Sequence, residues 1–225
     1  MTRITLIRHG ETLWNADGRF QGQQDIPLNE TGRAQARITA EACTPLPFTA
    51  IYTSDLSRAW ETAELIAAPH HLTPIRDARL REASFGEWEG CSLPEIAARW
   101  PEIVAAWRLD SLRTRPPGGE TLEAVQARVA DLLTVLVERH PDEEIAVVAH
   151  GGSVRAMIVQ ALGGDLTIFR RMRLDNCAVS VICGDGSDYA LVSLNDTCHL
   201  GTAHPRPTWD EAGDQWRRTT SAPPS

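Results

Sequence analysis

Strand-like and helix-like segments alternate along this chain of 225 residues. Apolar, β-rich runs that are typical of buried strands lie at 2–7, 49–53 and 145–149. Segments whose apolar residues keep helical spacing lie at 31–43, 57–68, 121–139 and from about 153 to 162. This alternation predicts an α/β fold: a three-layer sandwich with a mainly parallel central sheet and helices on both faces.

The remaining segments complete one domain over residues 1–200. Residues 93–107 look like two helices divided at Pro101, and we place them in a helical cap inserted at about 80–119. Two strands at 178–183 and 189–194 flank a turn rich in glycine and aspartate. The polar, proline-rich segment 201–225 is expected to form a partly disordered tail.

Residues whose side chains can bind anions or take part in catalysis follow three of the predicted strands. Arg8 and His9 end the first strand, Arg58 opens the helix after the second, and His150 follows the third. Because the carboxyl ends of parallel strands lie at one edge of a sheet, we expect these side chains to converge there. Gly10, directly after His9, is expected to let the backbone turn sharply.

Such a set suits phosphoryl transfer, which depends mainly on positioning and on neutralising charge. Guanidinium groups can clamp the phosphoryl oxygens, an unprotonated imidazole can attack phosphorus, and a second imidazole can donate a hydrogen bond. The leaving alkoxide needs a proton, which a carboxylic acid supplies. Glu82 suits this role, with Glu87 and Glu89 as close competitors. Since the arginines and His150 supply the positive charge, no metal or other cofactor is expected.

Composition excludes several other classes of protein. A net charge of −8 gives no sign of nucleic-acid binding. All 22 basic residues are arginine, so P-loop and Schiff-base lysines are excluded. Five scattered cysteines without a C-x-x-C pair argue against a zinc site or a disulfide framework. Without a long apolar run or a signal-peptide pattern, we expect no membrane contact and a reducing, cytoplasmic location.

The chain resembles the histidine phosphatase superfamily, the phosphoglycerate mutase-like enzymes, from Thr2 to about Leu200. The motifs that carry the resemblance are Arg8-His9-Gly10-Glu11-Thr12 with Trp14-Asn15 and Phe20-Gln21-Gly22, Asp25-Ile26-Pro27-Leu28, Ser54-Asp55-Leu56-x-Arg58-Ala59, Leu80-x-Glu82-x-x-Phe85-Gly86-x-Trp88-Glu89-Gly90 and Ala149-His150-Gly151. Together these blocks are highly specific, whereas Arg-His-Gly alone would not be.

The resemblance implies a role for each of these residues. His9 would carry the phosphoryl group as phosphohistidine, and Glu82 would donate a proton and then activate water. Arg8, Arg58 and His150 would hold the phosphoryl group. The residues expected to line the substrate pocket are Asn15, Gln21, Gly22 and Gly151.

A metal-independent phosphatase acting on a small phosphomonoester is the favoured interpretation. The resemblance implies that true mutases have a longer cap with a lysine and paired arginines, whereas this chain has no lysine and only residues 83–149 between Glu82 and His150. Possible substrates are phosphoserine, α-ribazole phosphate and phosphoglycerate-like sugar phosphates. The alternatives are a phosphoglycerate mutase and a non-catalytic binding protein on the same scaffold. Superfamily resemblance also makes a homodimer plausible.

Three further features have no assigned role. His70-His71 is interpreted as a solvated loop, because no further metal ligand follows at short spacing. The cluster Arg170-Arg171-x-Arg173 is either a solvated helix end or a second contact with an anion or a partner chain. His199 either lies near the site or has no function.

Overall fold

The computed structural model describes residues 1–110, 113–163 and 165–203. Within them one six-stranded sheet has the order β3-β2-β4-β1-β5-β6. Its strands are β1 (Thr2–Arg8), β2 (Phe48–Thr53), β3 (Ile75–Arg76), β4 (Glu144–Ala149), β5 (Val179–Gly184) and β6 (Tyr189–Asp196). The first four strands run parallel to one another, and β5 is antiparallel to both β1 and β6. The predicted mainly parallel sheet is confirmed.

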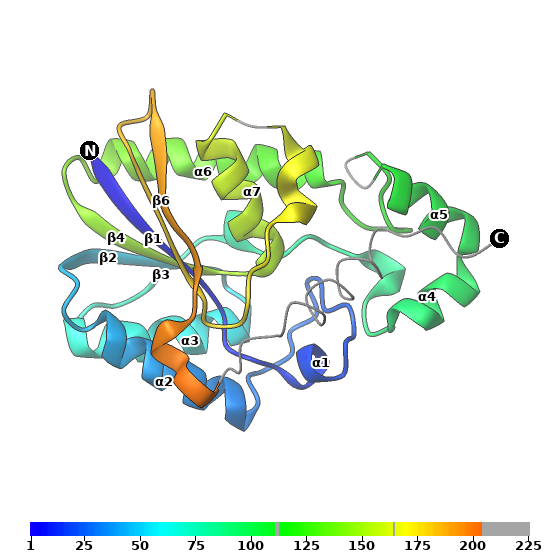
Figure 1. Ribbon diagram of the computed structural model, residues 1–225, viewed down its shortest axis with the longest axis horizontal. Coiled ribbons are helices and arrows are strands. Elements are labelled where there is room, and N and C mark those ends of the chain that lie inside the picture. Colours follow the sequence, from blue (N-terminus) through cyan, green and yellow to red (C-terminus); the bar gives the residue numbers. More distant parts are fainter. Residues whose placement is uncertain (111–112, 164, 204–225) are drawn as a thin grey trace.

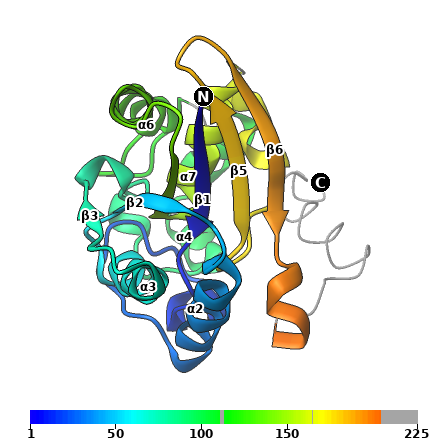
Figure 2. The ribbon, with the colours of Figure 1, turned by 90° about the vertical axis from the view of Figure 1, so that its left-hand side faces the viewer.

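Helices cover both faces of the sheet (Figures 1 and 2). The α-helices are α1 (Leu13–Ala16), α2 (Glu30–Cys43), α3 (Ser57–Ala67), α4 (Leu93–Arg99), α5 (Pro101–Leu109), α6 (Leu122–Arg139) and α7 (Gly151–Ala161). Helices α2 and α3 pack on one face and α6 and α7 on the other, whereas α4 and α5 lie beyond the carboxyl ends of the strands (Figure 1).

Side chains of β4 show why this strand is central. Ile145, Val147 and Ala149 pack into the apolar cluster with α6 and α7. Ala146 and Val148 point to the opposite face and pack against α2 and α3. Alternation places successive side chains on opposite faces, and burial of each large one contributes about 1.5–3 kcal/mol. The strand is therefore apolar at every one of these positions, which fixes its carboxyl end deep in the molecule.

Some elements differ from the sequence prediction. The two-residue strand β3 and the four-residue helix α1 are too short to leave a periodic pattern. Helix α7 begins at Gly151, two residues earlier than expected. Two glycines have poor helix propensity, but the N–H of Gly152 gains a charged partner in the first turn, the carboxylate of Glu82.

The segment predicted as a cap contains α4 and α5, divided at Pro101 as expected. Trp88 is fully buried there and packs with Ile96 and Val104. Residues 111–112 of this segment, and residues 204–225 of the predicted tail, lie outside the described residues. None of the helices in the described ranges is long and apolar enough to cross a membrane.

Candidate active site

Three neighbouring strands deliver the predicted residues to one edge of the sheet. His9 follows β1, His150 follows β4, and Arg58 lies in the first turn of α3 after β2. The strands are adjacent in the order β2-β4-β1. The imidazole rings of His9 and His150 meet edge to face, with their centroids 5.1 Å apart. The expected convergence of residues distant in sequence is therefore observed.

A cavity of about 220 Å³ opens at this edge. It is lined by Arg8, His9, Asn15, Gly18, Arg19, Phe20, Gln21, Gly22, Arg58, Glu82 and Phe85. Most of the predicted site residues are among them. His150 does not line this cavity but contacts the ring of His9, and Gly151 lines a neighbouring cavity together with Glu82.

Gly10 fixes the backbone beside His9 by close packing rather than by an unusual turn. A Cβ atom at this position would lie 2.5 Å from the carbonyl oxygen of Gly32 in α2. The residue does not have a positive φ, so this contact, and not the backbone conformation, excludes a side chain here. Its N–H donates to the hydroxyl of Thr62 in α3, which ties the loop after β1 to a second helix.

The His9 ring is held in one tautomer. Its Nδ1 lies 2.7 Å from the carbonyl oxygen of Gly10. Since a carbonyl oxygen can only accept, Nδ1 carries the hydrogen. Burial, together with the positive charges of Arg58 and Arg8, holds the pKa of His9 well below the usual 6.5. The ring is therefore neutral, and Nε2 carries the lone pair that a nucleophile needs.

His150 is fully buried, and the hydrogen-bonding capacity of its ring is unused within the described ranges. Neither of its ring nitrogens has a hydrogen-bond partner among the described residues. Burial lowers the pKa of His150 well below 6.5, and Arg58 and the neighbouring His9 add to this effect. A neutral imidazole that carries one unused N–H is suited to donate a hydrogen bond to an anion bound beside it.

The two arginines keep unused donors. Arg58 has no exposed surface and donates to the backbone carbonyls of Gly22 and Gln24, each at 2.8 Å. Arg8 donates to the carbonyl of Leu174 at 2.7 Å. The Nε atoms of both arginines are buried without a partner among the described residues. Burial lowers the pKa of Arg58 to about 10. Both guanidinium groups are therefore held in place, and their positive charge and unused N–H donors suit an anion.

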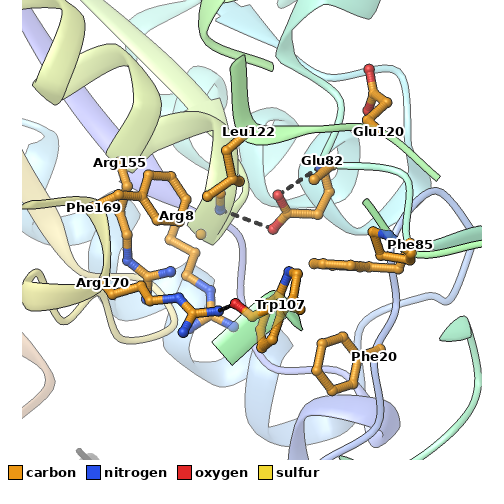
Figure 3. A pocket seen from close by; sticks show the side chains of 14 residues that line it. Arg8, Phe20, Glu82, Phe85, Trp107, Glu120, Leu122, Arg155, Phe169 and Arg170 are labelled. Atoms are coloured by element: carbon orange, nitrogen blue, oxygen red, sulfur yellow. Dashed lines mark hydrogen bonds between the residues drawn. The ribbon is translucent and has the colours of Figure 1, made fainter. Parts of the chain in front are cut away.

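Glu82 is held by two backbone amides. Its carboxylate accepts hydrogen bonds from Gly152 at 3.0 Å and from Ala83 at 2.8 Å (Figure 3). A Cβ atom at position 152 would lie 2.0 Å from Oε1 of Glu82, so the carboxylate can occupy this position only over a glycine. Both cavities at this edge are lined by Glu82.

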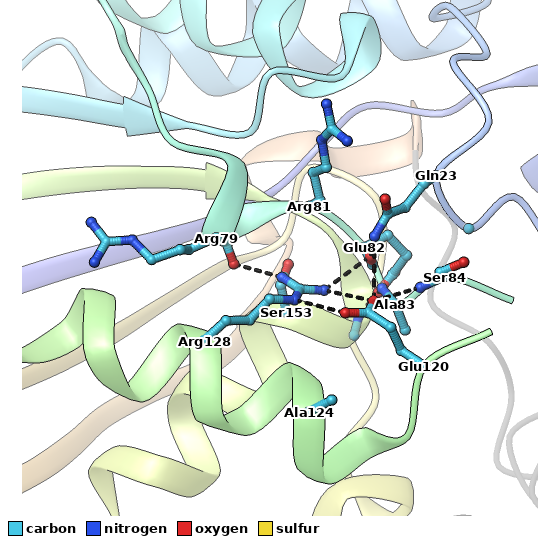
Figure 4. A network of polar contacts seen from close by, with 12 residues as sticks. Gln23, Arg79, Arg81, Glu82, Ala83, Ser84, Glu120, Ala124, Arg128 and Ser153 are labelled. Atoms are coloured by element: carbon cyan, nitrogen blue, oxygen red, sulfur yellow. Dashed lines mark hydrogen bonds and ion pairs between the residues drawn. The ribbon is translucent and has the colours of Figure 1, made fainter. Parts of the chain in front are cut away.

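A polar network behind Glu82 fixes its main chain (Figure 4). Arg128 and the amide of Gln23 donate to the carbonyl oxygen of Glu82, at 3.0 and 3.1 Å. Glu120 pairs with Arg128 at 3.3 Å and accepts from the N–H of Ser84 at 2.8 Å. Sequence reasoning missed these residues, because a helical arginine and a loop glutamate have no distinguishing local pattern.

The competing carboxylates have other surroundings. Glu87 is exposed. Glu89 accepts from the backbone N–H groups of Gln23 and Phe85, both at 3.0 Å, and so joins two loops. Of the three candidates, Glu82 alone lines the cavity beside His9.

Amide side chains line the rest of this cavity. The carbonyl oxygen of Asn15 accepts from the backbone of Thr12 at 3.1 Å, and that of Gln21 accepts from the Thr12 hydroxyl at 2.8 Å. These bonds orient both side chains and leave their NH2 groups as donors. The carbonyl of Gly22 accepts from Arg58.

The structure places His199 and the arginine cluster, to which the sequence assigned no role. His199 lies 3.0 Å from the Thr39 hydroxyl and lines neither cavity. Of the arginine cluster, Arg171 is exposed, Arg173 pairs with Asp175 at 2.8 Å, and Arg170 lines the neighbouring cavity. Among the described residues no group of three His, Cys, Asp or Glu side chains is arranged to hold a metal ion.

Comparison with known proteins agrees with this geometry. Residues 4–197 match the histidine phosphatase superfamily, branch 1. The chain belongs to this superfamily. The predicted family and the prediction of a phosphatase of the histidine type are confirmed.

Relatives within the superfamily include both phosphatases and mutases. Phosphoserine phosphatase 1 of Hydrogenobacter thermophilus is 35% identical over 201 residues, covering 89% of this chain and 95% of that protein. A probable phosphoglycerate mutase of Cronobacter sakazakii is 36% identical over 209 residues, with coverage of 89% and 95%. The structure of mycobacterial glucosyl-3-phosphoglycerate phosphatase with VO3 aligns with a TM-score of 0.81 at 33% identity, covering 87% of this chain and 99% of that one.

Acidification is expected to destabilise the folded protein through His9 and His150. The unfolded chain protonates each imidazole near pH 6.5, whereas burial lowers both pKa values in the folded state. Below this pH the unfolded state binds more protons, so the free energy of unfolding falls by up to about 1.4 kcal/mol per pH unit for each histidine. Urea denaturation between about pH 7.5 and 5.5 measures this slope.

His150→Asn should remove about half of that slope, because one of the two buried imidazoles is then absent. The exposed residue His71, replaced in the same way, serves as the control. An unchanged slope in His150→Asn would mean that folding does not lower the pKa of His150.

Proposed function

We propose that this chain hydrolyses small phosphomonoesters through a phosphohistidine on His9, without a metal ion or other cofactor. The observation that carries the proposal is the neutral His9 ring, whose Nε2 is left with a lone pair because Nδ1 donates to the Gly10 carbonyl. His9 lines a cavity together with Arg8, Arg58 and Glu82.

In the first step the substrate phosphoryl group is bound by Arg8, Arg58 and His150. Nε2 of His9 forms a bond to phosphorus while the bond from phosphorus to the leaving oxygen breaks. Glu82 donates a proton to this oxygen, and the product alcohol departs.

In the second step the Glu82 carboxylate takes a proton from water, and the water oxygen attacks the phosphohistidine. The bond from phosphorus to Nε2 breaks, which releases inorganic phosphate and restores His9. The buried guanidinium groups hold the same oxygens throughout and need no reorganisation. Asn15 and Gln21 supply further donors from the cavity wall.

A phosphatase and a mutase differ in the second acceptor of the phosphoryl group. We expect release of inorganic phosphate from phosphoserine, α-ribazole phosphate or 3-phosphoglycerate, with little transfer to another alcohol. Incubation with a labelled phosphomonoester and unlabelled 3-phosphoglycerate measures both products. Label that appears mainly on phosphoglycerate would establish the mutase alternative, and neither product from any donor would favour a non-catalytic binding protein.

The proposal extends to location and assembly. No disulfide joins cysteines within the described residues, which suits a reducing cytoplasm. Strand β6 forms one edge of the sheet and exposes Val192 and Leu194. A homodimer that pairs two such edges would satisfy the backbone groups of β6 and bring these side chains of the two copies side by side.

A further inference from the structure

A second cavity of about 320 Å³ adjoins the one that contains His9. Arg8, Phe20, Glu82 and Phe85 line both. A phosphoryl group bound at His9 would therefore have its leaving oxygen near Glu82 and the rest of the leaving group in the second cavity. The lining of this cavity determines which leaving groups fit.

One wall of the second cavity is aromatic. The ring of Phe20 meets Phe85 edge to face with centroids 5.0 Å apart, and Trp107 with centroids 6.3 Å apart. Figure 3 shows these three rings on one side of the cavity. Leu122 and Phe169 add further apolar lining. Such a wall favours a flat or apolar body over a small polar one.

The adjoining wall is cationic. Figure 3 shows Arg8, Arg155 and Arg170 gathered there. The guanidinium group of Arg170 stacks on the Trp107 ring, 4.1 Å from its centroid, and donates to the Trp107 carbonyl at 3.0 Å. The guanidinium of Arg155 lies 5.5 Å from the Phe169 ring centroid. These aromatic contacts hold the two cations without neutralising them.

Arg155 has an unused donor in a buried place. Its Nε atom has no hydrogen-bond partner among the described residues, and burial lowers the pKa of this arginine to about 10. A buried guanidinium with an unmet donor is costly unless an anion completes it. Arg155 extends from α7, the helix whose first turn binds Glu82, so it is fixed relative to the reacting atoms.

Among the described carboxylates, Glu82 and Asp175 favour the charged form of Arg155 from a distance, but neither forms an ion pair with it. Glu120 is paired with Arg128, and Glu82 is bound by two backbone amides. Within the described ranges neither Arg155 nor Arg170 forms an ion pair with a carboxylate. Arg8 also lines the His9 cavity and is assigned to the transferred phosphoryl group. Arg155 and Arg170 are therefore the cations of this cavity without an ion pair among the described residues, and the unused Nε of Arg155 can serve the leaving group.

We propose, on the basis of the function proposed above, that Arg155 and Arg170 bind a second anionic group on the leaving alcohol. The substrate is then a phosphomonoester in which a flat or apolar body joins the transferred phosphate to a carboxylate or another phosphate. Arg155 and Arg170 determine specificity; they do not take part in the bond-making steps.

A series of phenyl phosphates tests this with one constant body. Phenyl phosphate, which carries no added charge, is compared with three derivatives. The 4-carboxy derivative adds a carboxylate, the 4-phosphonomethyl derivative adds a phosphonate, and the 4-aminomethyl derivative adds a cation. Charge-assisted hydrogen bonds predict that kcat/KM of one or both anionic derivatives exceeds that of phenyl phosphate by about 10- to 100-fold. The cationic derivative should be the poorest substrate. The anionic derivative with the higher kcat/KM shows whether the site prefers a carboxylate or a phosphonate.

Arg155→Gln should bring the ratio of anionic to uncharged substrate close to one, and Arg155→Lys should restore part of it. Arg171→Gln is the matched control, because Arg171 is exposed in the same segment as Arg170 and does not line the cavity. Thermal unfolding establishes that each variant is folded. If phenyl phosphate is hydrolysed but no anionic preference exists, or Arg155→Gln retains that preference, the inference is wrong and the phosphatase proposal stands. If none of the four is hydrolysed while phosphoserine or 3-phosphoglycerate is, the inference is wrong and the phosphatase proposal stands. If those donors are not hydrolysed either, the proposed function itself fails.

Discussion

His9→Ala is expected to lower kcat for every phosphomonoester by at least about 10⁴-fold, because the group that forms the covalent bond is removed. Binding of inorganic phosphate should change by less than about tenfold, since Arg8 and Arg58 still supply charge-assisted donors. Steady-state kinetics and calorimetric phosphate binding measure the two effects separately. The wild-type enzyme, denatured without acid after reaction with a radioactively labelled substrate, should also retain the labelled phosphoryl group. His9→Ala should retain none.

A matched control for this variant is His71→Ala, which removes an exposed imidazole from the same chain. His150→Ala is more informative, because it removes the ring that contacts His9 but leaves the nucleophile in place. It should slow turnover and still accumulate labelled protein. Covalent label in His9→Ala, or turnover close to that of the wild type, would exclude the phosphohistidine mechanism.

The convergence of the site was predictable from the sequence because it depends on strand ends. Continuous apolar runs identify β1, β2 and β4, and parallel pairing then fixes where Arg8, His9 and His150 emerge. The number of residues between them is irrelevant to that argument. Gly10 shows what strand ends cannot predict. The sequence indicated that a glycine matters here, but the reason is that a side chain would collide with the carbonyl of Gly32 in α2, and this contact depends on helix packing.

Residues of the second cavity could not be found in this way. Arg155 lies in the middle of an apolar helix, and Arg170 lies in a short 3-10 segment, η4 (Leu166–Arg171), that has no clear periodicity. Each resembles an ordinary solvated arginine until Phe169 and Trp107 are seen against them. The sequence left a second anion contact open for the Arg170 cluster, and only the tertiary arrangement separates Arg170 from Arg171.

Glu82→Gln is the second change with a large expected effect, and this effect should depend on the leaving group. Hydrolysis of an alkyl phosphate such as phosphoserine should slow by about 10³-fold, because an alkoxide cannot depart without a proton. Hydrolysis of 4-nitrophenyl phosphate should slow by about tenfold or less, since that phenolate is stable unprotonated. Single-turnover rates for a series of leaving groups measure this dependence.

Glutamine is a suitable replacement because its carbonyl oxygen can still accept from Gly152 or Ala83, so the loop keeps a tie to α7. Glu89→Gln and Glu87→Gln are the controls. Glu89 joins two loops through the backbone of Gln23 and Phe85, so its loss should lower stability without steepening the leaving-group dependence. Glu87 is exposed and its replacement should change neither. A steep dependence in Glu89→Gln with a flat loss in Glu82→Gln would transfer the proton-donor role to Glu89. Equal losses for all leaving groups in Glu82→Gln would mean that the carboxyl positions the substrate and donates no proton, since only proton transfer distinguishes an alkoxide from a nitrophenolate.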